Sequence, residues 1–172
     1  MMRHLTPADY TTMPWANGKG RTIEMLRVEA EGRVKWRLSR ASVVENGDFS
    51  LFPGIERNLT VLTGPGFDLV GDGLHLAARP LVPVEFPGDL ALRAEGVSAP
   101  SDDFNVMTAR ALPRPEVAVV TGRVHLPQGG LLAIYALVPS GVNEQTMAAQ
   151  DLILTEDAAR VKGHTLVVRL LG

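Results

Sequence analysis

Short segments in which apolar and polar residues alternate run along most of the chain. In residues 34–43 (VKWRLSRASV), Trp36 and Leu38 fall on one face, and Arg37 and Ser39 fall on the other. A period of two is typical of β-strands, so this segment is predicted to be a strand. Further strands are predicted at residues 59–63, 67–70, 74–77, 82–86, 105–110, 117–125, 131–138, 151–155 and 165–171.

Glycine and proline turns separate these segments and favour pairing between neighbours. The turns GPG at residues 64–66 and GDG at residues 71–73 are typical of hairpins. This spacing favours an all-β sandwich or closed barrel over parallel strands with crossover helices. Little helix is expected, at residues 6–10 and 156–160. Pro113 and Pro115 would interrupt a strand ladder, so they predict a boundary between two β units.

Composition and charge exclude several classes of function. The 172 residues are 45% hydrophobic and 21% charged with a net charge of -2, which suits a globular core and provides no basic face for nucleic acid. Cysteine is absent, so disulfides and thiol nucleophiles are excluded and a cytoplasmic location is expected. The first residues lack the apolar region of a signal peptide, and the apolar stretch at residues 131–139 is too short to span a membrane as a helix.

Three clusters of residues carry a resemblance to a known family. They are MPWANGKG at residues 13–20, WRLS at 36–39 continuing to DFSLFPGIER at 48–57, and FNVM at 104–107. In this order and spacing the chain resembles the HutD/Ves family, most clearly over its first two thirds. Lys19 and Arg21 depart from the family pattern, in which these positions are often small or neutral.

The resemblance implies a cupin fold, that is, double-stranded β-helix barrels, two in one chain (a bicupin). Residues 1–112 would form the first barrel with an N-terminal extension, and residues 113–172 a second, smaller cupin-like unit packed on it. The resemblance also implies a role in histidine catabolism or in a stress response.

Cupins commonly bind a metal, but the ligand positions are altered in this chain. If Gly64 is the turn glycine of the first cupin motif, Arg57 occupies the position of the metal-binding glutamate, and the two histidine positions fall among residues 50–53, which contain no histidine. A guanidinium is a permanent cation and cannot coordinate a metal. We therefore expect no metal and no other cofactor.

Arg57 instead predicts an anion site, because a guanidinium pairs well with a carboxylate. The alternative is a surface residue paired with Glu56 or Asp48. Arg37 and Ser39 would line the same cavity if their face of the strand points inward, and would otherwise face water.

Four further residues are considered for the pocket. Trp15 and Asn17 could present a ring face and an amide to a planar acid, although Asn-Gly is also a common turn and Trp15 could belong to the core. Asn105 and Met107 share a strand face; Asn105 is expected to contact the ligand and Met107 to pack beneath it. Glu24 is a possible pocket carboxylate, or a solvated partner of Arg21 or Arg27.

Other chemistries have little support in the sequence. The glycine-rich turn at residues 17–20 does not fit a phosphate-binding loop, and no nucleophile elbow is present. The adjacent Asp102 and Asp103 are interpreted as a solvated turn, not as an acid–base pair.

These observations predict a metal-free bicupin that binds a small carboxylate metabolite, of the urocanate or formylated glutamate type, and regulates histidine catabolism or a stress response. The alternatives are a metal-independent isomerase or hydrolase acting on a small acid, with Glu24 as its only candidate acid or base, and an interaction protein with an incidental cavity. The expected partner is a small anionic metabolite and neither nucleic acid nor membrane, and a homodimer is left open.

Overall fold

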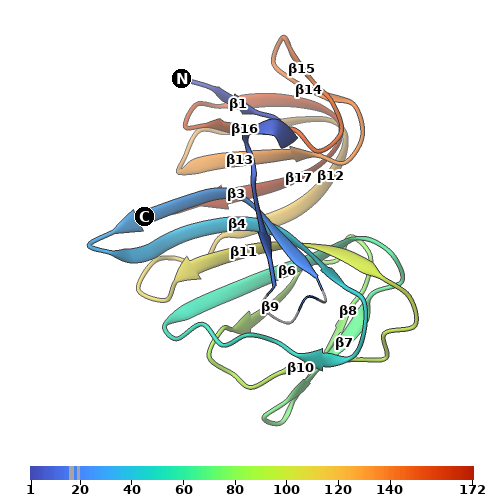
Figure 1. Cartoon of the computed structure of the whole chain (residues 1–172). Helices are drawn as coiled ribbons and strands as arrows, with labels where there is room; N and C mark the ends of the chain where they lie inside the picture. The colour runs from blue at the N-terminus through green and yellow to red at the C-terminus, as the bar shows by residue number, and fades with distance from the viewer. Residues whose placement is uncertain (16–17, 19) are drawn as a thin grey trace. The chain divides into compact units, whose positions relative to one another are not determined.

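The computed structural model describes residues 1–15, 18 and 20–172, and these residues form an all-β protein (Figure 1). Their only helix is a single 3-10 turn, η1 (Pro7–Asp9), at the first position where helix was expected. The prediction of an all-β fold with little helix is therefore confirmed. The described part of the chain contains no helix that could cross a membrane.

The chain divides into two compact units. Unit 1 comprises residues 1–10 and 112–172, and unit 2 comprises residues 11–111. The division at Ala111 and Leu112 falls next to Pro113, which has no N–H to donate to a strand ladder. The sequence placed residues 1–10 with the N-terminal barrel, whereas here β1 (Arg3–Leu5) pairs with β16 (Leu152–Thr155) and so lies in unit 1.

Unit 2 contains two antiparallel sheets. The six-stranded sheet has the order β2 (Thr11–Pro14), β3 (Arg21–Ala30), β4 (Arg33–Val43), β11 (Ser101–Ala109), β6 (Ile55–Thr63) and β9 (Val84–Pro87). The four-stranded sheet has the order β5 (Gly47–Asp48), β10 (Arg93–Glu95), β7 (Phe67–Gly71) and β8 (Leu74–Ala78). Apolar side chains from both sheets, including Leu59, Phe67 and Phe86, form the core of this unit.

Unit 1 contains one seven-stranded sheet. Its order is β1, β16, β13 (Leu131–Ala136), β17 (Ala159–Leu170), β14 (Ser140–Val142) and β15 (Gln145–Met147), and β12 (Glu116–Leu126) also pairs with β17. Alternate residues of β13 and β17, such as Leu132, Ile134, Val161 and Val167, point into its core. This alternation is the period-two pattern visible in the sequence.

All ten predicted strands coincide with observed strands, but the second helix prediction is wrong. Residues 156–160 do not form a helix, since Glu156 and Asp157 form a bend and β17 begins at Ala159. The Thr155 hydroxyl accepts a hydrogen bond from the Asp157 backbone N–H at 3.1 Å, a local bond that competes with helix formation. Strands β2 and β3 were not predicted; in β3 charged and apolar residues are mixed.

One glycine turn is required by close backbone packing. Gly66, between β6 and β7, has a φ of +84°, and a Cβ added there would lie 2.1 Å from the carbonyl oxygen of Ala78. Only glycine satisfies both conditions, so the GPG turn places β7 against β8.

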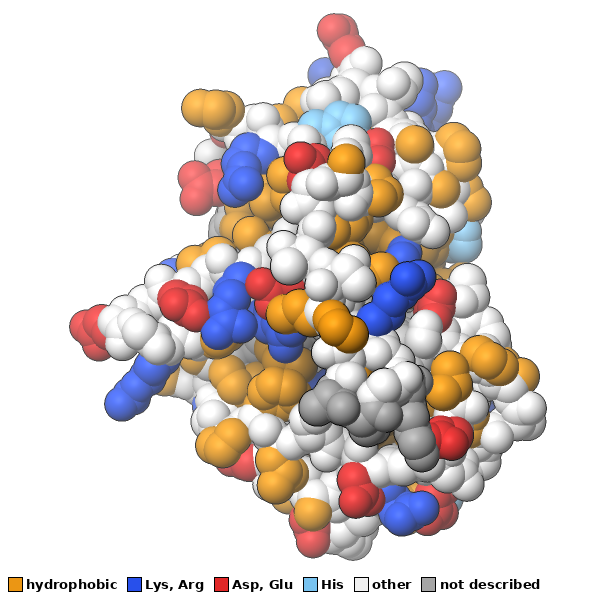
Figure 2. All heavy atoms as spheres, viewed as in Figure 1, with side chains coloured by type: hydrophobic (Ala, Val, Ile, Leu, Met, Phe, Trp, Pro, Cys, Tyr) orange, Lys and Arg blue, Asp and Glu red, His pale blue; other side chains and the backbone are white. Residues whose placement is uncertain are grey.

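The charged residues are dispersed over the surface. On the face seen in Figure 2, lysine and arginine side chains are interspersed with aspartate and glutamate side chains and do not gather into one basic patch. This distribution agrees with the small net charge of -2.

The core of unit 2 predicts a simple stability test. Leu59 is 0% exposed within it, so Leu59→Ala should lower the free energy of unfolding by about 2–5 kcal/mol through lost burial and a residual cavity. Urea denaturation followed by tryptophan fluorescence measures this change, since Trp15 and Trp36 both lie in unit 2. Leu51→Ala is the control, because Leu51 is 55% exposed and should change stability by at most about 0.5 kcal/mol. Equal effects of the two substitutions would contradict the assigned core.

Candidate functional site

A pocket of about 380 Å³ lies within unit 2 on one face of the six-stranded sheet; we call it the unit-2 pocket. Its walls come from β3, β4, β6 and β11, from Trp15, and from the segment at residues 48–52. The lining includes five of the six residues singled out from the sequence, namely Trp15, Arg37, Ser39, Arg57 and Asn105. The sixth, Asn17, lies outside the described residues.

Strand register explains how these residues come together. Asn105 on β11 pairs with Ser39 on β4, and Met107 lies between Arg37 on β4 and Arg57 on β6. Directly paired residues of antiparallel strands point to the same face of the sheet. One face of the adjacent strands β4, β11 and β6 therefore carries Arg37, Ser39, Asn105 and Arg57. The opposite face carries Leu38, which is 0% exposed.

Arg57 is buried, with only 8% of its surface exposed, and so is not a surface residue. Its Nη2 donates a hydrogen bond to Asn105 Oδ1 at 2.7 Å, whereas its buried Nε has no partner among the described residues. Glu56, considered from the sequence as a partner, instead accepts a bond from Arg110 at 2.6 Å. Burial lowers the pKa of Arg57 to about 10, and at neutral pH the guanidinium remains charged.

Three phenylalanine rings surround the Arg57 guanidinium. Its central carbon lies 5.3 Å from the ring centroid of Phe49, 5.2 Å from that of Phe52 and 5.1 Å from that of Phe86. Cation–π attraction of this kind contributes about 0.5–2 kcal/mol per contact and fixes the plane of the side chain. The rings also exclude water, which strengthens any ionic contact made by the guanidinium.

The sequence interpretation missed Asp103 as a residue of the pocket. The prediction of a solvated turn at Asp102 and Asp103 is wrong, because both lie in β11 and Asp103 is 1% exposed. The pairing of β11 with β6 shifts register between these two residues, and such a bulge can redirect side chains. Asn105 Nδ2 donates to Asp103 Oδ1, while Asp103 Oδ2 has no partner among the described residues.

Burial raises the pKa of Asp103 to about 7. The positive charge of Arg57 and the hydrogen bond from Asn105 act in the opposite direction, and the nearby charge of Asp102 adds to the increase. Asn105 thus links a buried cation and a buried acid through its side-chain amide. A carboxyl group with this pKa changes its protonation state near neutral pH.

Arg37 is held by an ion pair instead of facing open water. Its Nε lies 2.6 Å from Glu24 Oε2, and the two side chains are 12% and 16% exposed. Arg27 lies 3.8 Å from the same carboxylate, so Glu24 has Arg37 as its main partner in place of the solvated partner expected. Ser39, 2% exposed, lies beside Arg37 on the lining face of β4.

Trp15 forms one wall of the pocket and is only half-buried. Its Nε1 donates to Thr22 Oγ1 at 2.9 Å, which fixes the ring. A Cβ at Gly20 would lie 2.8 Å from the ring, so glycine at this position allows the indole to pack against the backbone. The ring therefore leaves part of its surface available to the pocket.

The residues of the pocket do not suit a transition metal. Among the described residues, the charged lining consists of Arg37, Arg57, Asp48 and Asp103 and contains no histidine. Across the described residues, no group of three or more histidine, cysteine, aspartate or glutamate side chains has metal-binding geometry. Two guanidinium groups beside an isolated buried carboxyl do not form the imidazole and carboxylate set that cupin metals use.

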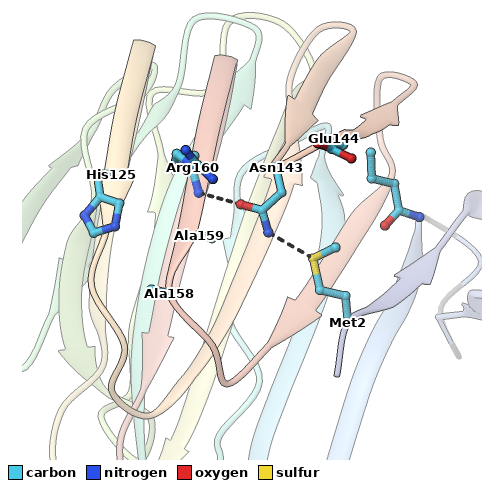
Figure 3. Close-up of a pocket in the computed structure, with 8 residues that line it drawn as sticks. Met2, His125, Asn143, Glu144, Ala158, Ala159 and Arg160 are labelled. Atoms are coloured by element: carbon cyan, nitrogen blue, oxygen red, sulfur yellow. Dashed lines mark hydrogen bonds between the residues drawn. The ribbon is translucent and has the colours of Figure 1, made fainter.

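A second hollow, of about 890 Å³, lies in unit 1 (Figure 3). His125, Asn143, Glu144 and Arg160, which line it, are all exposed. Asn143 accepts a bond from the Arg160 backbone N–H at 2.9 Å and donates to Met2 Sδ at 3.8 Å. This hollow is larger than the unit-2 pocket, but its charged lining residues Glu144 and Arg160 are exposed to solvent. The unit-2 pocket is therefore the stronger candidate site.

Sequence and structure comparisons identify related proteins. The family model HutD matches residues 7–168. A Pseudomonas putida protein described as an uncharacterized 21.2 kDa protein in the hutC 3' region is 33% identical over 167 residues, covering 93% of this chain and 86% of that protein. The solved structure of HutD from Pseudomonas fluorescens SBW25 (formate condition) is 26% identical with a TM-score of 0.91, and the match covers 99% of this chain and 98% of that chain.

More distant structures share the fold. A bacterial pirin, YhhW from Escherichia coli, solved in complex with nickel(II), is 8% identical with a TM-score of 0.71 and covers 99% of both chains. At that identity the match concerns the fold alone, which is cupin-like; the division into two cupin barrels stays a prediction. With the family model spanning nearly the whole sequence, the chain belongs to the HutD family, which is associated with the histidine utilisation locus.

Proposed function

We propose that this protein binds a small carboxylate metabolite in the unit-2 pocket without a metal and thereby regulates histidine catabolism. The observation that carries the proposal is the Arg57 guanidinium, which is buried in the pocket wall and whose Nε has no partner in the part of the chain that the structure describes. A buried cation without a full set of partners is costly, and an incoming carboxylate would supply both the charge and the acceptors.

The pocket suits a small, partly planar acid. Its volume of about 380 Å³ lies near the lower end of the range for small-molecule sites. Trp15 offers a ring face, while Ser39 and Asn105 offer polar groups to the rest of the molecule. Urocanate and N-formylglutamate combine a carboxylate with such features and are the ligands we propose.

The regulatory role rests on the family and not on the geometry. A relative is described by its place in the hutC 3' region, and the family is associated with histidine utilisation. A protein that binds a pathway acid without consuming it can report the concentration of that acid. A role in a stress response is the alternative regulatory context.

An enzyme acting on a small acid is the second candidate function. Glu24 is a poor base for it, because the carboxylate is paired with Arg37 at 2.6 Å. Asp103, with a pKa of about 7, is the group that favours this alternative. Incubation of the protein with urocanate and N-formylglutamate, followed by product analysis, distinguishes the two: unchanged ligand supports regulation, and turnover supports the enzyme.

Substitution of Arg57 tests the binding site directly. Arg57→Ala should weaken binding of the better ligand by about 2–5 kcal/mol in calorimetric titration, because the carboxylate loses its buried partner. Arg57→Lys should recover only part of the affinity, since an ammonium retains the charge but not the two-pronged geometry.

Arg79→Ala serves as the matched control for Arg57→Ala. Arg79 pairs with Asp68 at 2.7 Å, is 49% exposed and does not line the pocket, so its removal should leave affinity unchanged. Thermal melting without ligand checks that each variant folds. Folded Arg57→Ala protein with wild-type affinity would rule out the proposed anion site.

Metal content provides an independent prediction. The purified protein is expected to contain no stoichiometric transition metal, and EDTA should leave its melting temperature and ligand affinity unchanged, because arginine lines the pocket and imidazole does not. Elemental analysis that finds one tightly bound transition metal per chain would contradict the metal-free proposal.

A further inference from the structure

Resting on the proposed carboxylate binding, we propose that Asp103 binds the ligand as a neutral acid, its Oδ2–H donating a hydrogen bond to the ligand carboxylate that Arg57 holds. Asp103 is then a specificity-determining residue, and the ligand enters together with a proton. No covalent bond forms or breaks in the ligand; the proton comes from solvent and stays on Asp103 Oδ2 while the ligand is bound.

The geometry of Asp103 leaves one oxygen for this contact. Oδ1 accepts the hydrogen bond from Asn105 Nδ2, so a proton on the group belongs on Oδ2. Oδ2 is buried, and no described residue bonds to it. Asp103 and Arg57 both line the unit-2 pocket, and Asn105 contacts both. Arg57 and Asp103 therefore belong to one hydrogen-bonded cluster in the pocket wall, and Oδ2 is the Asp103 oxygen that no described residue occupies.

The charges around Asp103 explain why a bound anion favours its protonated form. The positive charge of Arg57, on β6, stabilises the ionised form of Asp103 and so opposes its protonation. From β4, Arg37 is neutralised by Glu24 on β3. Asp48, the other acid in the pocket lining, is 87% exposed, and so acts through solvent. When a ligand carboxylate shares Arg57, it weakens the stabilisation that the Arg57 charge gives to the Asp103 anion, and it adds a negative charge beside that anion.

Asp102, the remaining acid near Asp103, acts from the other face of β11. Its Oδ1 accepts a hydrogen bond from Ser42 Oγ, and strand alternation turns it away from the pocket. No described histidine lines the pocket, and Asp103 has a pKa of about 7, so the proton is assigned to Asp103.

The pH dependence follows from a pKa of about 7 in the free protein. Below that pH, Asp103 is already protonated before the ligand arrives, so binding takes up little proton and affinity is constant. Above it, the free carboxyl is ionised and must gain a proton on binding, so affinity falls as the pH rises. The loss approaches tenfold per pH unit until the pH reaches the higher pKa of the complex.

Calorimetric titration with N-formylglutamate measures this proton directly. Its carboxylates remain ionised from pH 6 to pH 8, so they do not contribute to proton uptake in that range. Titrations at each pH in two buffers that are not small oxyanions, and whose ionisation enthalpies differ, give the number of protons taken up per ligand. We expect about 0.9 at pH 8 and about 0.1 at pH 6 for a group with a pKa near 7.

Two variants locate the proton. Asp103→Asn mimics the neutral acid, since its amide can donate to the ligand and accept from Asn105; it should bind without proton uptake and at least as tightly as wild type at pH 8. Asp102→Asn is the matched control, because it removes the adjacent carboxyl from the opposite face. The Asp102→Asn protein should still take up a proton at pH 8. The uptake should be at most somewhat smaller than in wild type, because losing the Asp102 charge lowers the pKa of Asp103.

The outcomes separate this inference from the proposed function. Wild-type protein that binds N-formylglutamate with no proton uptake at pH 8 would overturn the role of Asp103 and leave the carboxylate site standing. Uptake that persists unchanged in Asp103→Asn would also overturn it, by placing the proton elsewhere. Wild-type protein that binds neither N-formylglutamate nor urocanate would contradict the proposed function itself.

Discussion

The unit-2 pocket depends on a guanidinium, that of Arg57, held in a water-poor wall of the six-stranded sheet. A buried charge is expensive unless neighbouring groups compensate it, and here the compensation is incomplete: three aromatic faces, one amide oxygen and an acid that is itself only partly ionised near neutral pH. This partly compensated cation is the basis of the proposed binding of a small anion in the pocket.

Asn105 is the structural link in this arrangement. Its amide oxygen accepts from Arg57 and its amide nitrogen donates to Asp103, so both groups are oriented by one side chain. All three side chains project from paired strands, β6 and β11, in which backbone hydrogen bonds fix the spacing. The site is therefore built on rigid elements, with Phe49 and Phe52 contributed by the connecting segment between β4 and β6.

Strand patterning made much of this arrangement predictable from sequence. Alternation in residues 34–43 placed Arg37 and Ser39 on one face, and the structure brings that face to the pocket. Asp103 was missed because adjacent acids resemble a solvated turn, and only strand pairing reveals that β11 buries one of them. The three phenylalanine rings around Arg57 were missed for a related reason. Phe86, for example, lies on β9, and it comes close to Arg57 because β9 pairs with β6, a strand far from it in the sequence.

A crystal structure with N-formylglutamate bound would test the central claim most directly. The account predicts a ligand carboxylate in the unit-2 pocket, with its oxygens within about 3 Å of both the Arg57 guanidinium and Asp103 Oδ2. A ligand seated in the hollow beside Asn143 and Arg160, or one bound in the unit-2 pocket without contact to Arg57, would contradict it.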